Sequence, residues 1–256
     1  MPDWNPELYL KFSRQRGRPA ADLIAQIDLN SPKTIIDLGC GTGTSTEQLH
    51  QRWPNAEITG LDSSPKMLDS AREVHPEWQW IESGIESWQP DEPYDLVFSN
   101  AALHWVPDHG RLFPALLNAV ADRGILAIQM PNNFQAPAHL AMKKGGADSR
   151  WAGALGDAAE NIFIQPAAFY YNALRKFARS VNIWETEYFQ VMDGPRAVLD
   201  WMRSTAMRPY LSRLANDVQR NQFEQFCLEE YERLFPGDDQ GKSLFPYKRM
   251  FIVACK

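Results

Sequence analysis

Cysteine is scarce, because the 256 residues contain only Cys40, Cys227 and Cys255. An odd number of cysteines without metal-ligand spacing argues against a disulfide framework and against a zinc site. Long apolar runs are also missing: the longest, such as 250–255, reach strand length, far short of the ~20 residues that span a bilayer. The first residues show no basic stretch followed by an apolar region, so no secretory signal is expected. These absences favour a cytoplasmic protein without a membrane segment or a metal.

An excess of positive charge is absent as well. The chain has 26 Lys and Arg against 32 Asp and Glu, for a net charge of −6. Binding of a nucleic-acid backbone needs a concentrated basic surface, so nucleic acid is not expected as a partner. With 44% hydrophobic residues, a chain of this length can bury about 70–75% of its unfolded surface. We therefore expect a self-sufficient core, a monomer or simple homodimer, and a small molecule as the binding partner.

Short apolar runs alternate with amphipathic stretches in the first half of the chain, a rhythm typical of βαβ units. Helices are predicted to begin near Thr44 and Ser63, where capping residues follow the apolar runs. The pattern predicts an α/β fold with a parallel sheet whose first strands occupy residues 34–38, 57–61, 78–81, 95–98 and 124–130.

The rhythm changes after residue 131. Two further strands are predicted at 181–191 and 245–255, and the apolar spacing between them is helical. We interpret the whole chain, 1–256, as one domain. Its predicted parts are an N-terminal helical cover (1–30), a cofactor-binding core (31–131), a variable helical segment (132–180) and a helical insertion between the last two strands (195–236).

A glycine loop follows the first predicted strand. Gly39, Gly41 and Gly43 stand at alternate positions before a helix, where glycine lets the backbone approach a ligand and helix N–H groups point outward. The dinucleotide fingerprint would need a third glycine at Thr44, so a pyrophosphate is not the best fit. Asp62 ends the second strand, where a carboxylate can accept both ribose hydroxyls of an adenosine. The loop and Asp62 together favour a nucleotide-like cofactor over a tight turn with a surface aspartate.

Several motifs carry a family resemblance. Asp37–Gly43, Gly60–Asp62 and Tyr94–Asn100 resemble the motifs of class I S-adenosylmethionine-dependent methyltransferases. Within that family the chain resembles the trans-aconitate methyltransferases at 4–10, 16–19, 103–109, 128–133, 207–210 and 249–254. The resemblance implies a Rossmann-like fold with a seven-stranded, mostly parallel sheet, an antiparallel last strand and a helical cap.

The resemblance also implies S-adenosylmethionine as the cofactor, with Asp62 on its ribose and Gly39 and Gly41 near its methionine end. The implied cofactor-binding residues are Tyr9, Phe12, Asp37, Gly39, Gly41, Asp62, Ser63, Gly84, Ile85 and Asn100. Many relatives carry an aspartate at the position of Gly84, where its carboxylate meets the adenine amino group. Our hypothesis is that this chain binds the cofactor more weakly than a Gly84→Asp variant would.

Methyl transfer to a carboxylate makes few chemical demands on the protein. A carboxylate with a pKa of about 4 is already ionised at neutral pH, so no general base and no catalytic residue are expected. Guanidinium groups suit a tricarboxylate, although any single arginine can equally be a surface residue. His104 is placed to bind a carboxylate, and Trp105 either shields the sulfonium or packs in the core. The predicted substrate-binding residues are Arg16, Arg18, His104, Trp105, Arg208 and Arg249.

The activity implied is formation of the monomethyl ester of trans-aconitate. One alternative is a methyltransferase for another small or carrier-bound carboxylic acid. A nicotinamide-dependent oxidoreductase is disfavoured by Thr44 in place of glycine. A regulatory module that only binds the cofactor is a further alternative.

Overall fold

The computed structural model describes residues 13–155, 158 and 162–256. The chain divides into two units. The described part of the larger unit comprises residues 13–131, 162–186 and 249–256, and that of the smaller unit comprises 132–155, 158 and 187–248. Each unit is described by itself below.

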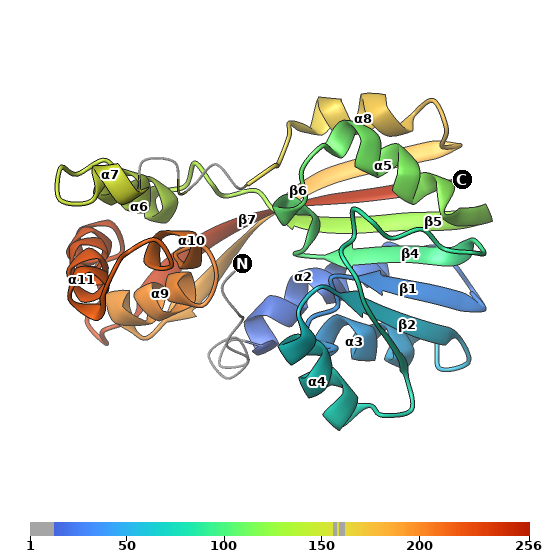
Figure 1. Cartoon of the computed structure of the whole chain (residues 1–256), viewed down its shortest axis with the longest axis horizontal. Coiled ribbons are helices and arrows are strands. Elements are labelled where there is room, and N and C mark those ends of the chain that lie inside the picture. The colour runs from blue at the N-terminus through green and yellow to red at the C-terminus, as the bar shows by residue number, and fades with distance from the viewer. Residues whose placement is uncertain (1–12, 156–157, 159–161) are drawn as a thin grey trace. The chain divides into compact units, whose positions relative to one another are not determined.

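A seven-stranded sheet organises the chain (Figure 1). Its strands run in the order β3-β2-β1-β4-β5-β7-β6, the first five parallel to their neighbours and β7 antiparallel to β5. The fold class predicted from the sequence is therefore confirmed. The strands are β1 (Thr34–Leu38), β2 (Glu57–Asp62), β3 (Gln79–Glu82), β4 (Tyr94–Asn100), β5 (Val120–Pro131), β6 (Ser180–Met192) and β7 (Ser243–Cys255).

Helices cover both faces of the sheet in the larger unit (Figure 1). α5 and α8 pack together on one face, over a core in which Phe113 and Tyr170 meet strand residues such as Val97 and Ile128. α2 packs against α3 and β5 on the other face. Burial on both faces explains why these strands read as nearly continuous apolar runs. The helices are α2 (Ser13–Ala25), α3 (Thr44–Arg52), α4 (Pro65–Val74), the 3₁₀ turn η1 (Leu103–Trp105), α5 (His109–Asn118) and α8 (Ala167–Leu174).

The smaller unit is mainly helical. α11 packs against both α6 and α9, and Tyr210 stacks on Phe223 with ring centroids 5.5 Å apart. A Cβ added to Gly145 of α6 would lie 2.9 Å from the Phe223 and Phe226 rings, so glycine lets these helices approach closely. The helices are α6 (Pro137–Gly146), α7 (Ala152–Leu155), α9 (Gly194–Arg203), α10 (Arg208–Leu211) and α11 (Asp217–Leu234).

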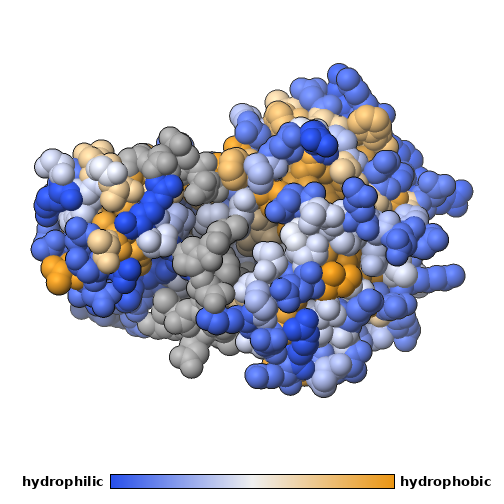
Figure 2. Space-filling model, in the orientation of Figure 1, coloured by the Kyte–Doolittle hydropathy of each residue, from blue (hydrophilic) through white to orange (hydrophobic). Residues whose placement is uncertain are grey.

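The surface of the larger unit carries some apolar area. On the face shown in Figure 2 this area lies over α5 and α8, and the exposed aromatic residues in and after α8 are Tyr171 and Phe177. Within the described part of the chain, no helix combines the length and the apolar character that a membrane span requires.

Candidate active site

The carboxyl ends of the parallel strands meet at one edge of the sheet. Strands β2 and β3 lie on one side of β1, whereas β4 and β5 lie on the other, so the strand order switches between β1 and β4. In open α/β sheets, ligands bind outside the carboxyl ends of the strands at such a switch point. The candidate site is therefore expected in the loops after β1, β2 and β4.

The three glycines after β1 share a positive φ but differ in what surrounds them. Gly39 has a φ of +74°, and a Cβ there would lie 2.2 Å from the Cβ of Ala102. Gly43 has a φ of +84°, and its Cβ would lie 2.9 Å from the Trp80 ring. Gly41 has a φ of +58°, and apart from its chain neighbours no atom of the described residues lies within 4 Å of the position its Cβ would take. Packing explains Gly39 and Gly43, whereas Gly41 leaves space beside the loop in the described part of the chain.

Asp62, at the end of β2, is held by the neighbouring backbone. Its Oδ2 accepts a hydrogen bond from the Gly41 N–H at 2.9 Å, and its Oδ1 accepts one from the Ser64 N–H at 2.8 Å. Burial raises the pKa of this carboxyl above its usual value, and the backbone donors partly oppose that shift. Each carboxylate oxygen has a second lone pair, so Asp62 keeps acceptor capacity for two hydroxyl groups. Ser63, also predicted at the site, is exposed beside it.

Asp37 is fully buried on β1. Its Oδ2 accepts hydrogen bonds from the hydroxyls of Ser45 and Thr46, both at 2.8 Å, whereas its Oδ1 has no hydrogen-bond partner in the described part of the chain. Burial is the main cause that raises its pKa from 3.8 to about 6. Because Gly43, the N-cap of α3, makes no side-chain capping bond, Asp37 fastens the first turn of this helix to β1. Asp37 therefore positions α3 through its Oδ2, and its Oδ1 keeps its capacity to accept a hydrogen bond.

Sequence reasoning missed a carboxylate beside Gly84. The Glu86 side chain lies 2.9–3.0 Å from the position that a Cβ of residue 84 would take. The space that an aspartate at position 84 would use is thus already bordered by a carboxylate from two residues further on. Ile85 is buried in the core of the larger unit, so its side chain packs, and only its backbone remains as a ligand contact. An acidic residue two positions after Gly84 was the only signal in the sequence.

The end of β4 adopts a strained conformation next to the glycine loop. Ala101 has a φ of +55°, a conformation that costs a non-glycine residue about 1–2 kcal/mol. The turn places Ala102 against Gly39. Asn100, just before the turn, is half-buried, and no described residue forms a hydrogen bond with its Oδ1. Backbone strain of this kind concentrates at functional sites, which supports the predicted place of Asn100 beside a ligand.

The turn η1 carries His104, which is 4% exposed, and Trp105, which is half-buried. The neighbouring residue Leu103 is fixed by His109, whose Nε2 lies 2.9 Å from the Leu103 carbonyl oxygen and whose Nδ1 lies 2.8 Å from the Tyr170 hydroxyl. Burial lowers the pKa of His109, which favours the neutral ring. In that ring Nε2–H donates to Leu103 and Nδ1 accepts from Tyr170. His109 therefore positions the turn that bears His104 and Trp105.

The predicted cationic residues belong to different parts of the chain. Arg16 and Arg18 lie in α2, and Arg249 is half-buried in β7, where it pairs with Pro131 of β5. These three lie in the larger unit, whereas Arg208 begins α10 in the smaller unit. The predicted cofactor residues Tyr9 and Phe12 lie outside the described residues. Contacts of these residues with a ligand remain predictions.

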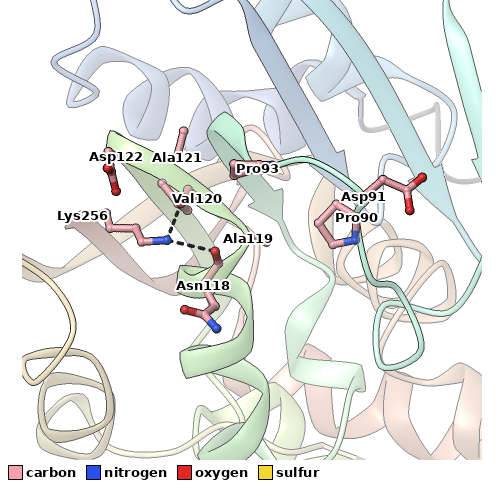
Figure 3. Close-up of a pocket in the computed structure, with 9 residues that line it drawn as sticks. All are labelled: Pro90, Asp91, Pro93, Asn118, Ala119, Val120, Ala121, Asp122 and Lys256. Atoms are coloured by element: carbon pink, nitrogen blue, oxygen red, sulfur yellow. Dashed lines mark hydrogen bonds between the residues drawn. The ribbon is translucent and has the colours of Figure 1, made fainter.

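A pocket of about 390 Å³ lies at the opposite end of the strands, between the loop before β4 and the start of β5. The side chain of Lys256 points into this region, and its Nζ donates to the carbonyl oxygens of Asn118 and Val120 at 3.0 and 2.6 Å (Figure 3). The ammonium group thus binds the end of α5 and the start of β5. Because this pocket lies at the amino ends of β4 and β5, it is distinct from the candidate active site.

Comparison with known proteins connects this geometry to a family. Residues 35–124 match a family model described as a methyltransferase domain. The trans-aconitate 2-methyltransferase of Yersinia pestis (strain Pestoides F) is 42% identical over 255 residues, which cover 99% of this chain and 98% of the relative. The enzyme of the same name from Azoarcus sp. (strain BH72) is 41% identical over 260 residues and the full length of both chains. The chain belongs to the trans-aconitate 2-methyltransferase family.

Solved structures of more distant proteins share the fold of this trans-aconitate 2-methyltransferase family member. The YcgJ protein of Bacillus superposes with a TM-score of 0.61 at 12% identity, over 93% of this chain and 98% of that one. The phosphoethanolamine N-methyltransferase 2 of Haemonchus contortus, solved with S-adenosyl-L-methionine, has a TM-score of 0.57 at 14% identity, over 93% and 52% of the two chains. At these identities the likeness shows the fold alone.

Proposed function

We propose that this protein transfers the methyl group of S-adenosylmethionine to a carboxylate of trans-aconitate, forming the monomethyl ester and S-adenosylhomocysteine. The observation that carries the proposal is the 41–42% identity, over nearly the whole chain, to proteins named for this activity. The geometry of the candidate site supports it, because the switch point offers a carboxylate with spare acceptor capacity, Asp62, next to an open glycine, Gly41.

The described residues fit the cofactor at the switch point. Asp62 would accept the two ribose hydroxyls while it keeps its bonds to Gly41 and Ser64. The open space beside Gly41 would let the methionine part pass close to the backbone. Asp37 would hold the first turn of α3 in place beside it. Gly39, Ser63, Gly84, Ile85 and Asn100, and the sequence-predicted Tyr9 and Phe12, complete the proposed contacts.

The chemistry needs alignment more than proton transfer. When bound, S-adenosylmethionine would supply a methyl group on a positively charged sulfur, activated for transfer to a carboxylate oxygen of the acceptor with S-adenosylhomocysteine as the leaving group. No proton moves, so the chain needs no general base. Its residues have to bring the acceptor into line and exclude water, a source of large rate effects.

The acceptor carries several negative charges, which the larger unit is equipped to meet. Arg16 and Arg18 on α2 and Arg249 on β7 are the proposed carboxylate ligands there, with His104 and Trp105 from the turn after β4. A charge-assisted hydrogen bond from a guanidinium contributes about 1.5–3 kcal/mol. Arg208 of the smaller unit is proposed as a further ligand from the sequence.

A panel of acids tests the proposed substrate. The purified chain would be supplied with excess S-adenosylmethionine and, in separate reactions, trans-aconitate, its cis isomer, a monocarboxylic acid of similar size and a carrier-bound acyl group. We expect trans-aconitate to give the highest kcat/KM for ester formation. Turnover of the monoacid or the carrier-bound group without turnover of trans-aconitate would contradict the proposal, as would binding of the cofactor without a product from any acid.

We also propose that the protein acts in the cytoplasm, as a monomer or simple homodimer without nucleic-acid or membrane partners. Cys40, Cys227 and Cys255 are all free thiols, which suits a reducing compartment. Cell fractionation and light scattering of the purified protein test the two parts separately. Recovery in a membrane fraction, or a higher-order assembly, would contradict this proposal.

A further inference from the structure

Two carboxamide side chains share one face of the sheet at the edge of the candidate site. Asn100 of β4 pairs in register with Gln129 of β5, and neighbouring register partners project from the same face. Gln129 is 1% exposed, and its Nε2 has no hydrogen-bond partner among the described residues. The same holds for the Asn100 Oδ1. A buried donor and a buried acceptor thus lie on neighbouring register positions without a partner in the described part of the chain.

Packing alone does not explain an amide at position 129. Its register partner on the other side is Phe251 of β7, whose ring stacks on Trp184 with centroids 4.9 Å apart and planes 5° from parallel. The nearest residue on the same face of β5, Ala127, is fully buried and apolar. An apolar side chain of the same size would suit Phe251 and Ala127 as neighbours. Native proteins pair almost all buried polar groups, so an unpaired amide at the edge of a candidate site is a candidate contact for a ligand.

The position of Gln129 relative to charged groups suits a carboxylate. Arg249 pairs with Pro131, two residues from Gln129 along β5, so Arg249 and Gln129 lie on the same face of the sheet. On its other side Gln129 has Asn100, which precedes the strained turn at Ala101. A guanidinium, an amide and the switch point therefore follow one another along the edge. This order places Gln129 between the proposed charge clamp and the proposed cofactor contact.

We propose that Gln129 binds the reacting carboxylate of the acceptor, with its Nε2–H donating to the oxygen that is not methylated. This inference rests on the proposed function. A neutral amide orients the carboxylate without cancelling its charge, so the attacking oxygen keeps its electron density. Rotation about the three side-chain torsions of glutamine brings the amide toward the half-buried side chain of Asn100, where the acceptor meets the cofactor. Arg249 then serves another carboxylate of the same acid.

The test compares Gln129→Leu and Gln129→Glu with the wild type. For Gln129→Leu we expect kcat/KM for trans-aconitate to fall at least tenfold, with the Kd for S-adenosylhomocysteine within twofold of the wild type and the Tm unchanged or higher. A higher Tm follows because the variant removes an unpaired buried polar group. For Gln129→Glu we expect a larger loss at neutral pH, partly recovered at low pH, where a protonated carboxyl again donates a hydrogen bond.

Gln79→Leu is the matched control, because it makes the same change in the same sheet at a residue on β3 that bonds Thr59. We expect its kinetics to match the wild type. Gln129→Leu kinetics within twofold of the wild type would overturn the inference. So would a lower Tm with unchanged kinetics, since the two amides would then stabilise the fold by pairing with each other. A wild type that makes no ester would instead overturn the proposed function, and this inference with it.

Discussion

The two halves of the candidate site differ in how their polar groups are satisfied. In the cofactor half, at the ends of β1 and β2, Asp62 accepts from Gly41 and Ser64, and Asp37 accepts from two hydroxyls of α3. In the proposed acceptor half, at the ends of β4 and β5, the Asn100 Oδ1 and the Gln129 Nε2 have no hydrogen-bond partner among residues 13–155, 158 and 162–256. The chain thus orients both carboxylates of the first half, although the Asp37 Oδ1 and the Ser64 Oγ also lack a partner among the described residues. We propose that the two amides of the second half are oriented by what they bind.

The charges of the two halves differ as well. In the cofactor half the Asp62 carboxylate suits the hydroxyls of an adenosine ribose, whereas Asp37 is fully buried and bonded to α3. The acceptor half presents neutral amides and the guanidinium of Arg249, which suit an anionic acid. The net charge of −6 is therefore compatible with a small anionic substrate. What matters for binding is the local charge at the strand ends.

Removing Asp62 should give the largest effect. Asp62→Ala removes the acceptors for Gly41 and Ser64 and for the two ribose hydroxyls, and two charge-assisted hydrogen bonds contribute roughly 3–6 kcal/mol. We expect the Kd for S-adenosylhomocysteine, measured by calorimetry, to rise at least a hundredfold. Asp69→Ala, which breaks an exposed ion pair with Arg72 on α4, is the control. A Kd within threefold of the wild type for Asp62→Ala would remove the adenosine site from β2.

Asp37→Asn tests whether the cofactor half stores strain. The folded-state pKa of about 6 lies above the usual 3.8, so this carboxyl contributes most stability below about pH 4 and loses that contribution as the pH rises through 6. One pKa unit corresponds to about 1.36 kcal/mol, so the ionised Asp37 carboxylate lowers the free energy of unfolding by about 3 kcal/mol at pH 7. We expect Asp37→Asn to raise the free energy of unfolding at pH 7 by about 1–3 kcal/mol and to bind the cofactor more weakly.

Denaturant unfolding of Asp37→Asn and the wild type between pH 4 and 7 measures this effect. The difference in unfolding free energy between the two proteins should grow as the pH rises. A difference that is constant across this range would show that Asp37 does not titrate there. A variant that is more stable and still binds the cofactor as tightly would assign Asp37 to the fold alone.

Arg249→Ala tests the acceptor half. Loss of one charge-assisted contact of about 1.5–3 kcal/mol should raise the KM for trans-aconitate about tenfold or more, with the Kd for the cofactor unchanged. Arg175→Ala changes an exposed arginine after α8 in the same unit and should leave both values as they are. Equal KM values for Arg249→Ala and the wild type would show that Arg249 does not bind a carboxylate of the acceptor.

The smallest effect concerns Gly84. The sequence alone favours tighter cofactor binding by Gly84→Asp, but the Glu86 carboxylate already lies about 3 Å from the space that the new side chain would enter. Two carboxylates at that distance repel each other, so we now expect Gly84→Asp to bind the cofactor no more tightly than the wild type. Glu86→Gln should weaken binding a few-fold. Calorimetry on both variants decides, and a clear gain for Gly84→Asp would restore the original hypothesis.

Sequence reasoning reached the two halves unequally. Motifs along the first half of the chain predict the α/β fold class. The loop at Gly41 and the acidic residue Asp62 follow from motifs within one βα unit, where the spacing of residues determines the geometry. The same reasoning could not predict that Gly39 and Gly43 are required by close packing against Ala102 and Trp80. These two partners come from parts of the chain beyond the first βα unit. The sequence predicted a role for Asn100 but not for its neighbour Gln129, because the two residues are brought together by the register of β4 and β5.

The most direct test of the central claim follows the methyl group itself. The wild type would be incubated with trans-aconitate and S-adenosylmethionine labelled in the methyl group, and the product analysed by mass spectrometry before and after mild alkaline hydrolysis. The account predicts one labelled methyl per acid, released as methanol by alkali, as expected of a monomethyl ester. Label that resists alkali, or no labelled acid from a protein that binds the cofactor, would contradict it.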